Sequence, residues 1–223
     1  MTIVGATGDL GFGLALRLAK AGTPVVIGSR DGDRAEQAAE QAAGHVPGAQ
    51  IRGLENPEAA AESEIVIVSV PFPSQAPTLK SLRGVLREGQ IVVDVTAPLA
   101  STVGGRATRV LQVWQGSAAQ QAQELVPRGV SVVSALHTVA AAHLADLDYA
   151  FDEDVLVTGD DRDARRRVAE LIERVEGLRA VDCGKLEVAR LTEQLTALTI
   201  SINIRHRTTA GIKITGLPDE LWS

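Results

Sequence analysis

The feature that most constrains the fold of this chain is a group of three glycines near its start. Residues 2–4 predict a short strand, the next residues read Gly5-Ala6-Thr7-Gly8-Asp9-Leu10-Gly11, and a helical pattern follows directly. Glycines in this context allow a tight turn, a close approach of a ligand to the backbone, and close packing of the helix on the sheet. The start of the helix presents unpaired N–H groups to an anion. The pattern predicts a dinucleotide-binding loop, with a purely structural turn as the alternative.

The rest of the chain alternates short β-branched runs with stretches of helical periodicity. This alternation is typical of a parallel sheet covered by helices on both faces. We predict an α/β fold, namely a Rossmann-type doubly wound and mainly parallel sheet with a small C-terminal helical unit. The expected strands cover residues 2–4, 25–27, 65–70, 91–95, 130–134 and 155–157. The expected helices cover a segment ending before Gly22 and residues 31–43, 75–86, 117–125 and 163–175.

The end of the second expected strand indicates which dinucleotide binds. NAD-specific proteins normally place a carboxylate there, whereas NADP requires cations for its 2′-phosphate. This strand ends in Ser29 and Arg30, and Arg34 follows one helical turn later. A guanidinium can bind a phosphate through two parallel hydrogen bonds. Asp31 follows the arginine and is available as a helix cap, so the pattern favours NADP(H) over NAD(H).

The composition argues against nucleic acid and against a membrane. The net charge of −6 repels phosphate backbones at long range, and aromatic residues, at 3% of the chain, are too few to form rows of stacking rings. The densest apolar run, residues 65–70, is too short to span a bilayer. Cys183 is the single cysteine and has no intrachain disulfide partner. We expect a cytoplasmic protein. We expect no metal centre, because the acidic groups at 152–154 and 160–161 are typical of turns.

Few residues could serve as a general acid or base. Dehydrogenases of alcohols and hydroxy acids commonly use His, Lys or Tyr at the reacting oxygen. The single tyrosine, Tyr149, has no Tyr-x-x-x-Lys partner. His137 follows a buried-type strand and is expected near the ligand-binding edge, with a structural histidine as the alternative. We therefore nominate no catalytic acid or base.

Several motifs resemble a known family. The chain is similar to NADPH-dependent coenzyme F420 reductases (F420:NADP oxidoreductases) in the glycine-rich start, Gly28-Ser29-Arg30, Val133-Ser134-Ala135-Leu136-His137-Thr138, Gly159-Asp160-Asp161 and Gly177-Leu178-Arg179. The resemblance implies hydride transfer between NADP(H) and the deazaflavin coenzyme F420 as co-substrate, in a homodimer. Residues 1–138 would form the NADP-binding Rossmann-type domain. Residues 139–223 would form a small unit that contributes to the deazaflavin site and the dimer interface.

The resemblance also implies which residues bind each cofactor. NADP(H) would be held by the glycine-rich loop, the end of the second strand and the carboxyl edge of the sheet, through Gly5, Thr7, Gly8, Asp9, Leu10, Gly11, Ser29, Arg30, Arg34, Phe72, Ala76, Leu99 and Ala141. The deazaflavin would lie against His137, Val139, Arg190, Thr196 and Ala210. His137, Arg190 and Thr196 would orient or polarise the rings. For Arg190, an ion pair with Glu187 or Glu193 is the alternative.

Two other functions remain open from the sequence. One is an NADP-dependent reductase of a small imine or acid, as in the pyrroline-carboxylate reductase group, whose C-terminal helical unit is usually larger than the roughly 85 residues after His137. The other is a non-catalytic NADP-sensing domain, which would need no second cofactor site. The apolar stretch at 186–205 is wider than one helical stripe, so we expect the rest of the fold or a second copy of the chain to cover it.

Overall fold

One mixed sheet organises the molecule. The computed structural model describes residues 1–218 and 220–222, and within them the strands follow the order β3-β2-β1-β4-β5-β6-β7-β8. Neighbouring strands are parallel except β6 and β7, which are antiparallel. The strands are β1 Thr2–Val4, β2 Val25–Ser29, β3 Ile51–Glu55, β4 Ile65–Val68, β5 Ile91–Asp94, β6 Ser131–Ser134, β7 Glu153–Gly159 and β8 Leu178–Asp182. The predicted doubly wound, mainly parallel sheet is confirmed.

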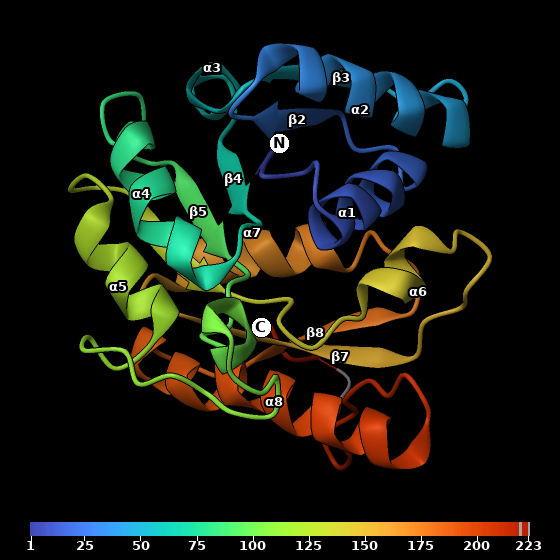
Figure 1. The fold of residues 1–223 in the computed structure, drawn as a ribbon, viewed down its shortest axis with the longest axis vertical. Coiled ribbons are helices and arrows are strands. Elements are labelled where there is room, and N and C mark those ends of the chain that lie inside the picture. Colours follow the sequence, from blue (N-terminus) through green and yellow to red (C-terminus); the bar gives the residue numbers. More distant parts are fainter. Residues whose placement is uncertain (219, 223) are drawn as a thin grey trace.

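Helices cover both faces of this sheet (Figure 1). They are α1 Asp9–Lys20, α2 Gly32–His45, α3 Asn56–Ala61, α4 Phe72–Leu82, α5 Ala118–Leu125, α6 Ala141–Ala145, α7 Arg162–Ile172 and α8 Ala189–His206, with 3-10 turns η1 Ala100–Val103 and η2 Leu186–Val188. One core cluster contains buried residues of α1, α2, α6 and α7, and a second contains those of α3, α4, α5 and the start of α8. Alanine and aliphatic side chains make up both clusters apart from Phe151 in the first, in keeping with the scarcity of aromatic residues.

The sequence patterns located most elements but not all of their ends. The expected strand at 2–4 is confirmed as β1, whereas the expected helix at 75–86 begins earlier and ends earlier, as α4. Pro71 and Pro73 lie at its start, where a missing N–H costs little. The patterns missed β3, α3, α6 and β8. Strand β3 is half exposed at the sheet edge and therefore lacks a continuous apolar run.

The prediction that residues 152–154 form a turn is wrong. Glu153 and Asp154 begin β7 and are both buried. Asp154 accepts two hydrogen bonds from Arg179 of β8, at 2.7 and 2.8 Å, and this contact lowers the pKa of the Asp154 carboxyl. A buried carboxylate is tolerated in a strand when it is paired in this way.

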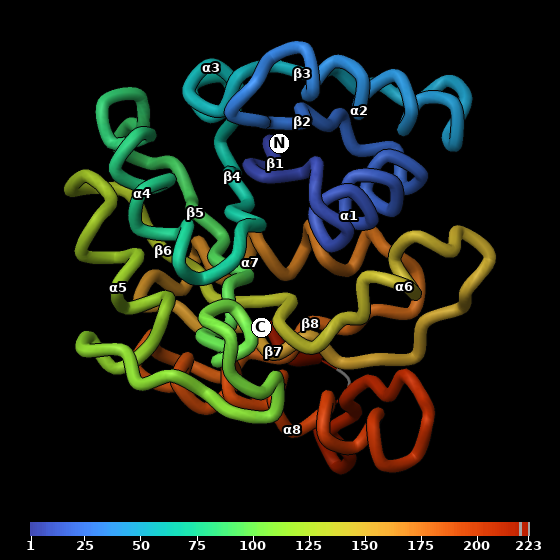
Figure 2. Tube along the Cα trace, viewed as in Figure 1, coloured from blue at the N-terminus to red at the C-terminus, as the bar shows by residue number. Residues whose placement is uncertain are grey.

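The C-terminal third continues the sheet and ends in α8. Strands β7 and β8 extend the sheet beyond β6, and the division of the chain at residue 138 stays a prediction. The blue N-terminal segments and the red α8 lie at opposite ends of the molecule (Figure 2). Leu191 and Leu198 of α8 are 56% and 54% exposed, so the rest of the fold does not cover the whole apolar stretch. Within the described residues, no helix has the combination of length and apolar character needed to cross a bilayer.

A buried arginine attaches α6 to α1. The Arg17 guanidinium donates to the carbonyl oxygens of His143 (2.8 Å), Leu144 (3.2 Å) and Tyr149 (3.0 Å), and also to that of Asp146. It lies 4.7 Å from the centre of the Phe151 ring. Because the segment around α6 is short, these bonds to its carbonyl groups fix its place beside α1.

We predict that Arg17→Met lowers the free energy of unfolding by about 2–4 kcal/mol, because buried carbonyl groups lose their charged donor. Chemical denaturation followed by circular dichroism measures this change. The matched control is Arg166→Met on α7, where the side chain is about half exposed, and its effect should stay within about 0.5 kcal/mol. Equal effects of the two substitutions would contradict the role given to Arg17.

Candidate functional site

The glycine-rich loop joins β1 to α1, and its three glycines have different roles. A Cβ atom on Gly5 would lie 2.5 Å from the carbonyl oxygen of Ser69, and one on Gly11 would lie 2.8 Å from Cα of Ala6. Both glycines are therefore required by the packing of the chain itself. A Cβ on Gly8 would meet nothing closer than 3.6 Å. Gly8 thus leaves open space above the backbone, where a ligand can approach.

The start of α1 faces this open space. The N-cap is Gly8, which provides no side-chain cap. The first N–H groups of an α-helix have no acceptor within the helix, and together with the helix dipole they favour an anion. Thr7, Gly8 and Asp9 are exposed. The loop therefore provides a surface suited to a pyrophosphate.

A cavity of about 850 Å³ lies beside the loop and brings the predicted cations to it. Its lining includes Thr7 and Gly8 of the loop and Ser29, Arg30 and Arg34 at the end of β2 and start of α2. Its volume falls in the range of small-molecule sites. The Asp31 carboxylate accepts a hydrogen bond from the backbone N–H of Arg34 at 3.3 Å and caps α2. That predicted capping role is confirmed, and it leaves the two arginines as the charged groups suited to a phosphate.

Asn56 is a residue of this cavity that sequence reasoning missed. It is 5% exposed at the start of α3, and its Oδ1 atom has no hydrogen-bond partner among the described residues. This oxygen packs against Gly28 of β2, where an added Cβ atom would lie 2.9 Å from it, so Asn56 holds α3 against the strand that carries Ser29. No pattern in the sequence indicated it, because α3 is a short helix that was not predicted.

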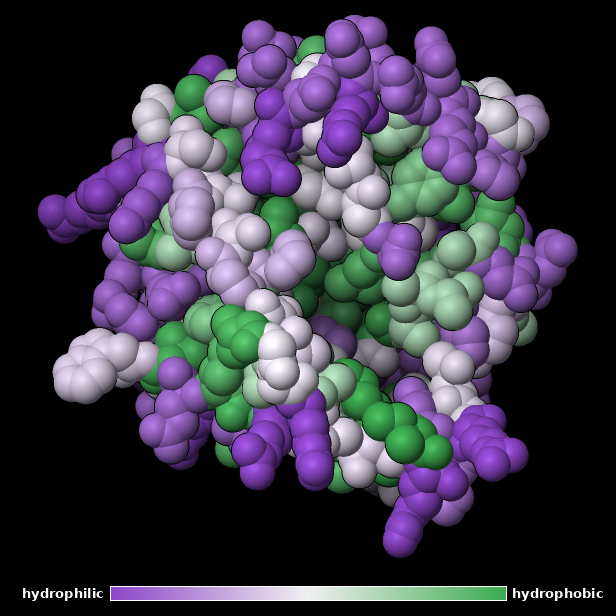
Figure 3. Space-filling view, viewed as in Figure 1, coloured by the Kyte–Doolittle hydropathy of each residue, from purple (hydrophilic) through white to green (hydrophobic). Residues whose placement is uncertain are grey.

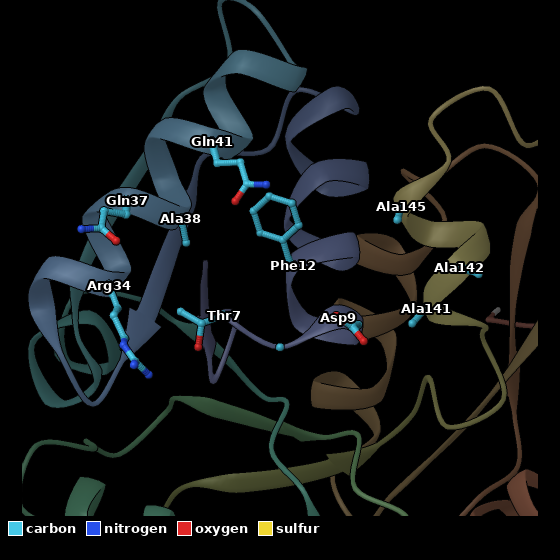
Figure 4. A pocket seen from close by; sticks show the side chains of 11 residues that line it. Thr7, Asp9, Phe12, Arg34, Gln37, Ala38, Gln41, Ala141, Ala142 and Ala145 are labelled. Carbon is cyan, nitrogen blue, oxygen red and sulfur yellow. The ribbon is translucent and has the colours of Figure 1, made fainter.

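A second cavity, of about 640 Å³, lies on the other side of Thr7 and Arg34. Figure 4 shows α1 between α2 and α6, with Phe12 of α1 and Gln41 of α2 directed toward each other. Ala141 of α6 lines this cavity together with Thr7, Gly8 and Asp9. The fold therefore brings Ala141 to the glycine-rich loop, although more than a hundred residues separate them.

His137 lies in the segment that leaves the carboxyl end of β6. Its ring is almost buried, and Nε2 lies 3.3 Å from the hydroxyl of Ser134. Burial lowers the pKa of His137 to about 4, so the imidazole is neutral at neutral pH. The preceding residue, Leu136, has φ of +67°, a left-handed conformation that is unusual for a residue other than glycine. The hydroxyl of Thr196 on α8 donates to the carbonyl oxygen of His137 at 3.0 Å.

The other implied site residues are spread around the carboxyl edge. Phe72 and Ala76 are on α4, Leu99 follows β5, Arg190 is exposed on α8, and the N–H of Ala210 donates to Asn203 at 2.8 Å. Neither these residues nor His137, Val139 and Thr196 belong to the lining of the two cavities. Figure 3 shows a hollow with apolar side chains at the centre of this face, between the regions of α1, α6 and η1. The deazaflavin contacts stay a prediction.

A buried carboxyl lies beneath this edge, at the end of β5. Asp94 Oδ1 accepts from the hydroxyl of Thr96 at 2.7 Å, and Oδ2 accepts from Nε2 of Gln75 at 2.6 Å. Complete burial raises the pKa of Asp94 from 3.8 to about 7, against the opposing effect of these hydrogen bonds. The sequence placed Asp94 in a strand but gave no indication of this environment.

The sheet, the loop and the basic cavity define a class: a Rossmann-type dinucleotide-binding protein. Residues 1–98 match the model of a family described as NADP oxidoreductase coenzyme F420-dependent. The chain is 42% identical to the F420-dependent NADP reductase of Methanothermobacter thermautotrophicus, over 99% of this chain and 96% of that protein. It is 43% identical to the Methanocaldococcus jannaschii enzyme of that name, over 97% and 98%. The chain belongs to the family of F420-dependent NADP reductases.

Solved structures agree with this fold. A crystal structure described as an F420-dependent NADP-reductase from Arthrobacter sp. FB24 has a TM-score of 0.79 and 27% identity, over 96% of this chain and 98% of that one. A pyrroline-5-carboxylate reductase from Coxiella burnetii has a TM-score of 0.55 and 10% identity, over 92% and 77%. At that identity, the likeness to the imine-reducing group extends to the fold alone.

The raised pKa of Asp94 predicts a pH dependence of stability. The folded state binds the Asp94 proton more tightly than the unfolded state, so this contribution is complete below about pH 4 and is lost as the pH rises to about 7. Asp94→Asn should remove this contribution, so that between pH 4 and 7 its unfolding free energy falls less, or rises more, than that of the wild-type protein. Denaturant midpoints measured at several pH values test this.

The control for that series is Asp148→Asn, at an exposed position after α6. It should keep the pH dependence of the wild-type protein. An Asp94→Asn protein with the unchanged wild-type slope would show that Asp94 does not titrate in this range.

Proposed function

We propose that this protein transfers a hydride between NADP(H) and the deazaflavin coenzyme F420. The reaction is NADPH + H⁺ + oxidised F420 ⇌ NADP⁺ + reduced F420. The observation that carries the NADP half is the cavity in which the open backbone at Gly8 faces Ser29, Arg30 and Arg34. Membership of the family supports F420 as the second cofactor.

In this proposal, each group near the loop has a role in holding NADP(H). The N–H groups of residues 7–11 bind the pyrophosphate, and Ser29, Arg30 and Arg34 bind the 2′-phosphate. Phe72, Ala76, Leu99 and Ala141 would contact the rest of the dinucleotide, as the family likeness implies. Since Gly8 is not required by the protein's own packing, the space above it is available for a phosphate group.

The second half of the proposed site orients the deazaflavin. His137, Val139, Arg190, Thr196 and Ala210 would surround it. The neutral, buried ring of His137 could accept or donate one hydrogen bond, but it has no charge at neutral pH with which to protonate a ligand. Bound together, the two cofactors supply the hydride donor and acceptor, and the protein mainly holds them at reacting distance. No general acid is assigned.

The experiment that tests the proposal follows the visible absorbance of oxidised F420 in the presence of NADPH and the protein. Loss of absorbance at a rate proportional to protein concentration is the expected result. The same assay with a cyclic imine in place of F420 tests the alternative reductase. Tight NADPH binding without turnover of either compound would replace the proposal with a sensing role.

We also propose that the protein is a homodimer that contacts itself through α8. Leu191, Leu198 and Ile202 are exposed at spacings of seven and four residues, which places them in one stripe along the helix. Contiguous apolar side chains are uncommon on the surface of a monomeric protein, because their exposure to water is unfavourable. Such a stripe is typical of a protein–protein interface. We further propose that the protein is cytoplasmic, because its two cofactors, NADP(H) and F420, are diffusible.

For the cofactor site, we predict that Arg30→Ala raises KM for NADPH about 10- to 100-fold, the loss expected for one or two charged hydrogen bonds. KM for F420 and KM for NADH should change by less than about 2-fold, since neither ligand has a 2′-phosphate. The control is Arg128→Ala, at an exposed position far along the chain. A parallel rise of both NADPH and F420 constants would place Arg30 elsewhere.

For the dimer, we predict that Leu198→Asp converts it to a monomer in sedimentation velocity, because the interface would have to bury a carboxylate. Ile204→Asp is the matched control. Ile204 is 68% exposed on the same helix but is turned away from the stripe. A wild-type protein that sediments as a monomer at micromolar concentration, or equal effects of both variants, would contradict the proposed interface.

A further inference from the structure

Glu193 is a buried acid that the reaction described above does not use. It lies on α8 and is 1% exposed. Its two carboxyl oxygens accept hydrogen bonds from the backbone N–H groups of Ala118 and Ala119, at 2.9 and 3.0 Å. These two residues form the first turn of α5, whose N-cap is Ser117. One side chain therefore attaches α8 to the start of another helix.

This attachment continues through buried hydrogen bonds to the edge of the sheet. The carbonyl oxygen of Ala118 accepts from Nε2 of Gln75 on α4 at 2.9 Å, and that amide also donates to Asp94 at the end of β5. Oε1 of Gln75 accepts from Gln121 on α5 at 2.8 Å. Gln75 is fully buried. The chain of contacts thus links α8, α5 and α4 to the carboxyl end of β5.

Apolar packing alone does not fix the rotation of α8. Ala189 and Ala197 face the protein, while Leu191 and Leu198 face outward, so apolar side chains lie on opposite sides of the helix. Burial of apolar surface is non-directional and would tolerate a rotated or shifted helix. The two hydrogen bonds from α5 do not tolerate a rotation or a shift of α8, because each N–H group must have one oxygen of Glu193 at the correct distance and angle.

The position of α8 matters for the proposed deazaflavin site. Arg190 and Thr196 lie three residues before and after Glu193, on adjacent turns. Thr196 donates to the carbonyl oxygen of His137, in the segment that also carries Val139. A shift of α8 would therefore move Arg190, break the bond from Thr196, and release the segment at 137–139.

We propose that Glu193 is a positioning residue that sets the register of α8 and so places Thr196 and Arg190 beside the His137 segment. The inference rests on the proposed function for its kinetic consequence only. Burial raises the pKa of the Glu193 carboxyl to about 8, and Asp94 is the charged group of the neighbouring elements that acts in the same direction. Burial of this carboxyl is unfavourable, and both of its oxygens accept hydrogen bonds. This combination is consistent with a role of Glu193 in specifying the position of α8.

The test compares Glu193→Gln and Glu193→Ala with the wild-type protein and with Gln194→Ala, an exposed control on the same helix. Glutamine keeps one acceptor oxygen for α5 and loses the other, whereas alanine loses both. We measure the dissociation constants of F420 and NADPH separately by fluorescence titration, KM and kcat for each, and backbone hydrogen exchange over residues 135–145. The melting temperature shows whether each variant is folded at the assay temperature.

The expected result is graded. The F420 dissociation constant rises about 10-fold or more in Glu193→Ala and by less in Glu193→Gln, while that of NADPH stays within about 2-fold. Exchange over 135–145 accelerates in the same order, and Gln194→Ala resembles the wild type. If the alanine variant does not fold, the F420 dissociation constant and the exchange rates of the glutamine variant alone test the proposal.

Equal weakening of both cofactors would overturn the proposal, because it would show a general loss of structure. Unchanged F420 binding together with unchanged exchange over 135–145 would also overturn it. If the wild-type protein does not turn over F420, the proposed function fails. The exchange measurement then still decides whether Glu193 positions the His137 segment.

Discussion

The structure depends on the close contact between the first turn of α1 and the ends of β1 and β4. Gly5 and Gly11 make this contact possible, since a Cβ atom on either would overlap neighbouring backbone atoms. The contact holds the N–H groups of α1 at the carboxyl edge of the sheet. Strand β2 pairs with β1 in parallel, so its end delivers Ser29 and Arg30 to the same edge. Backbone geometry therefore brings the N–H groups of α1 and the side chains of Ser29 and Arg30 to one edge. This is how a chain with a net charge of −6 can still present a basic cavity.

The parts that could be predicted from the sequence are those set by local residues. The glycine-rich loop, the Arg30 and Arg34 pair and the cap at Asp31 each depend on neighbours within a few positions, and the structure brings them together as expected. Features that depend on distant partners could not be predicted. Asp154 is typical of a turn when only its neighbours in the sequence are considered, and its burial in β7 depends on Arg179 of β8. Asn56 lines the cavity at the start of α3, directly after the edge strand β3, which has no continuous apolar run.

The C-terminal third is held in place by a few directional polar contacts. Arg17 binds carbonyl groups around α6, and Glu193 binds N–H groups at the start of α5. Both contacts use the charged or polar end of one side chain against the backbone of another segment. The core clusters are packed mainly from small aliphatic residues, and the rings of His143, Tyr149 and Phe151 contact one another beside Arg17. Hydrogen bonds to the backbone add a directional constraint to this packing.

This arrangement indicates which residues of the chain determine its activity. A reaction that moves a hydride between two bound rings is sensitive to their separation and alignment, and it places small demand on acid or base side chains at the site. The residues that matter most would then lie one layer behind the cofactors, where they fix the segments that touch them. In the proposed site, Glu193 would hold the helix that carries Thr196, Gln75 the helix that carries Ala76, and Arg17 the segment around α6 that begins at Ala141. The scarcity of candidate acids and bases in the sequence is, on this view, a direct consequence of the proposed chemistry.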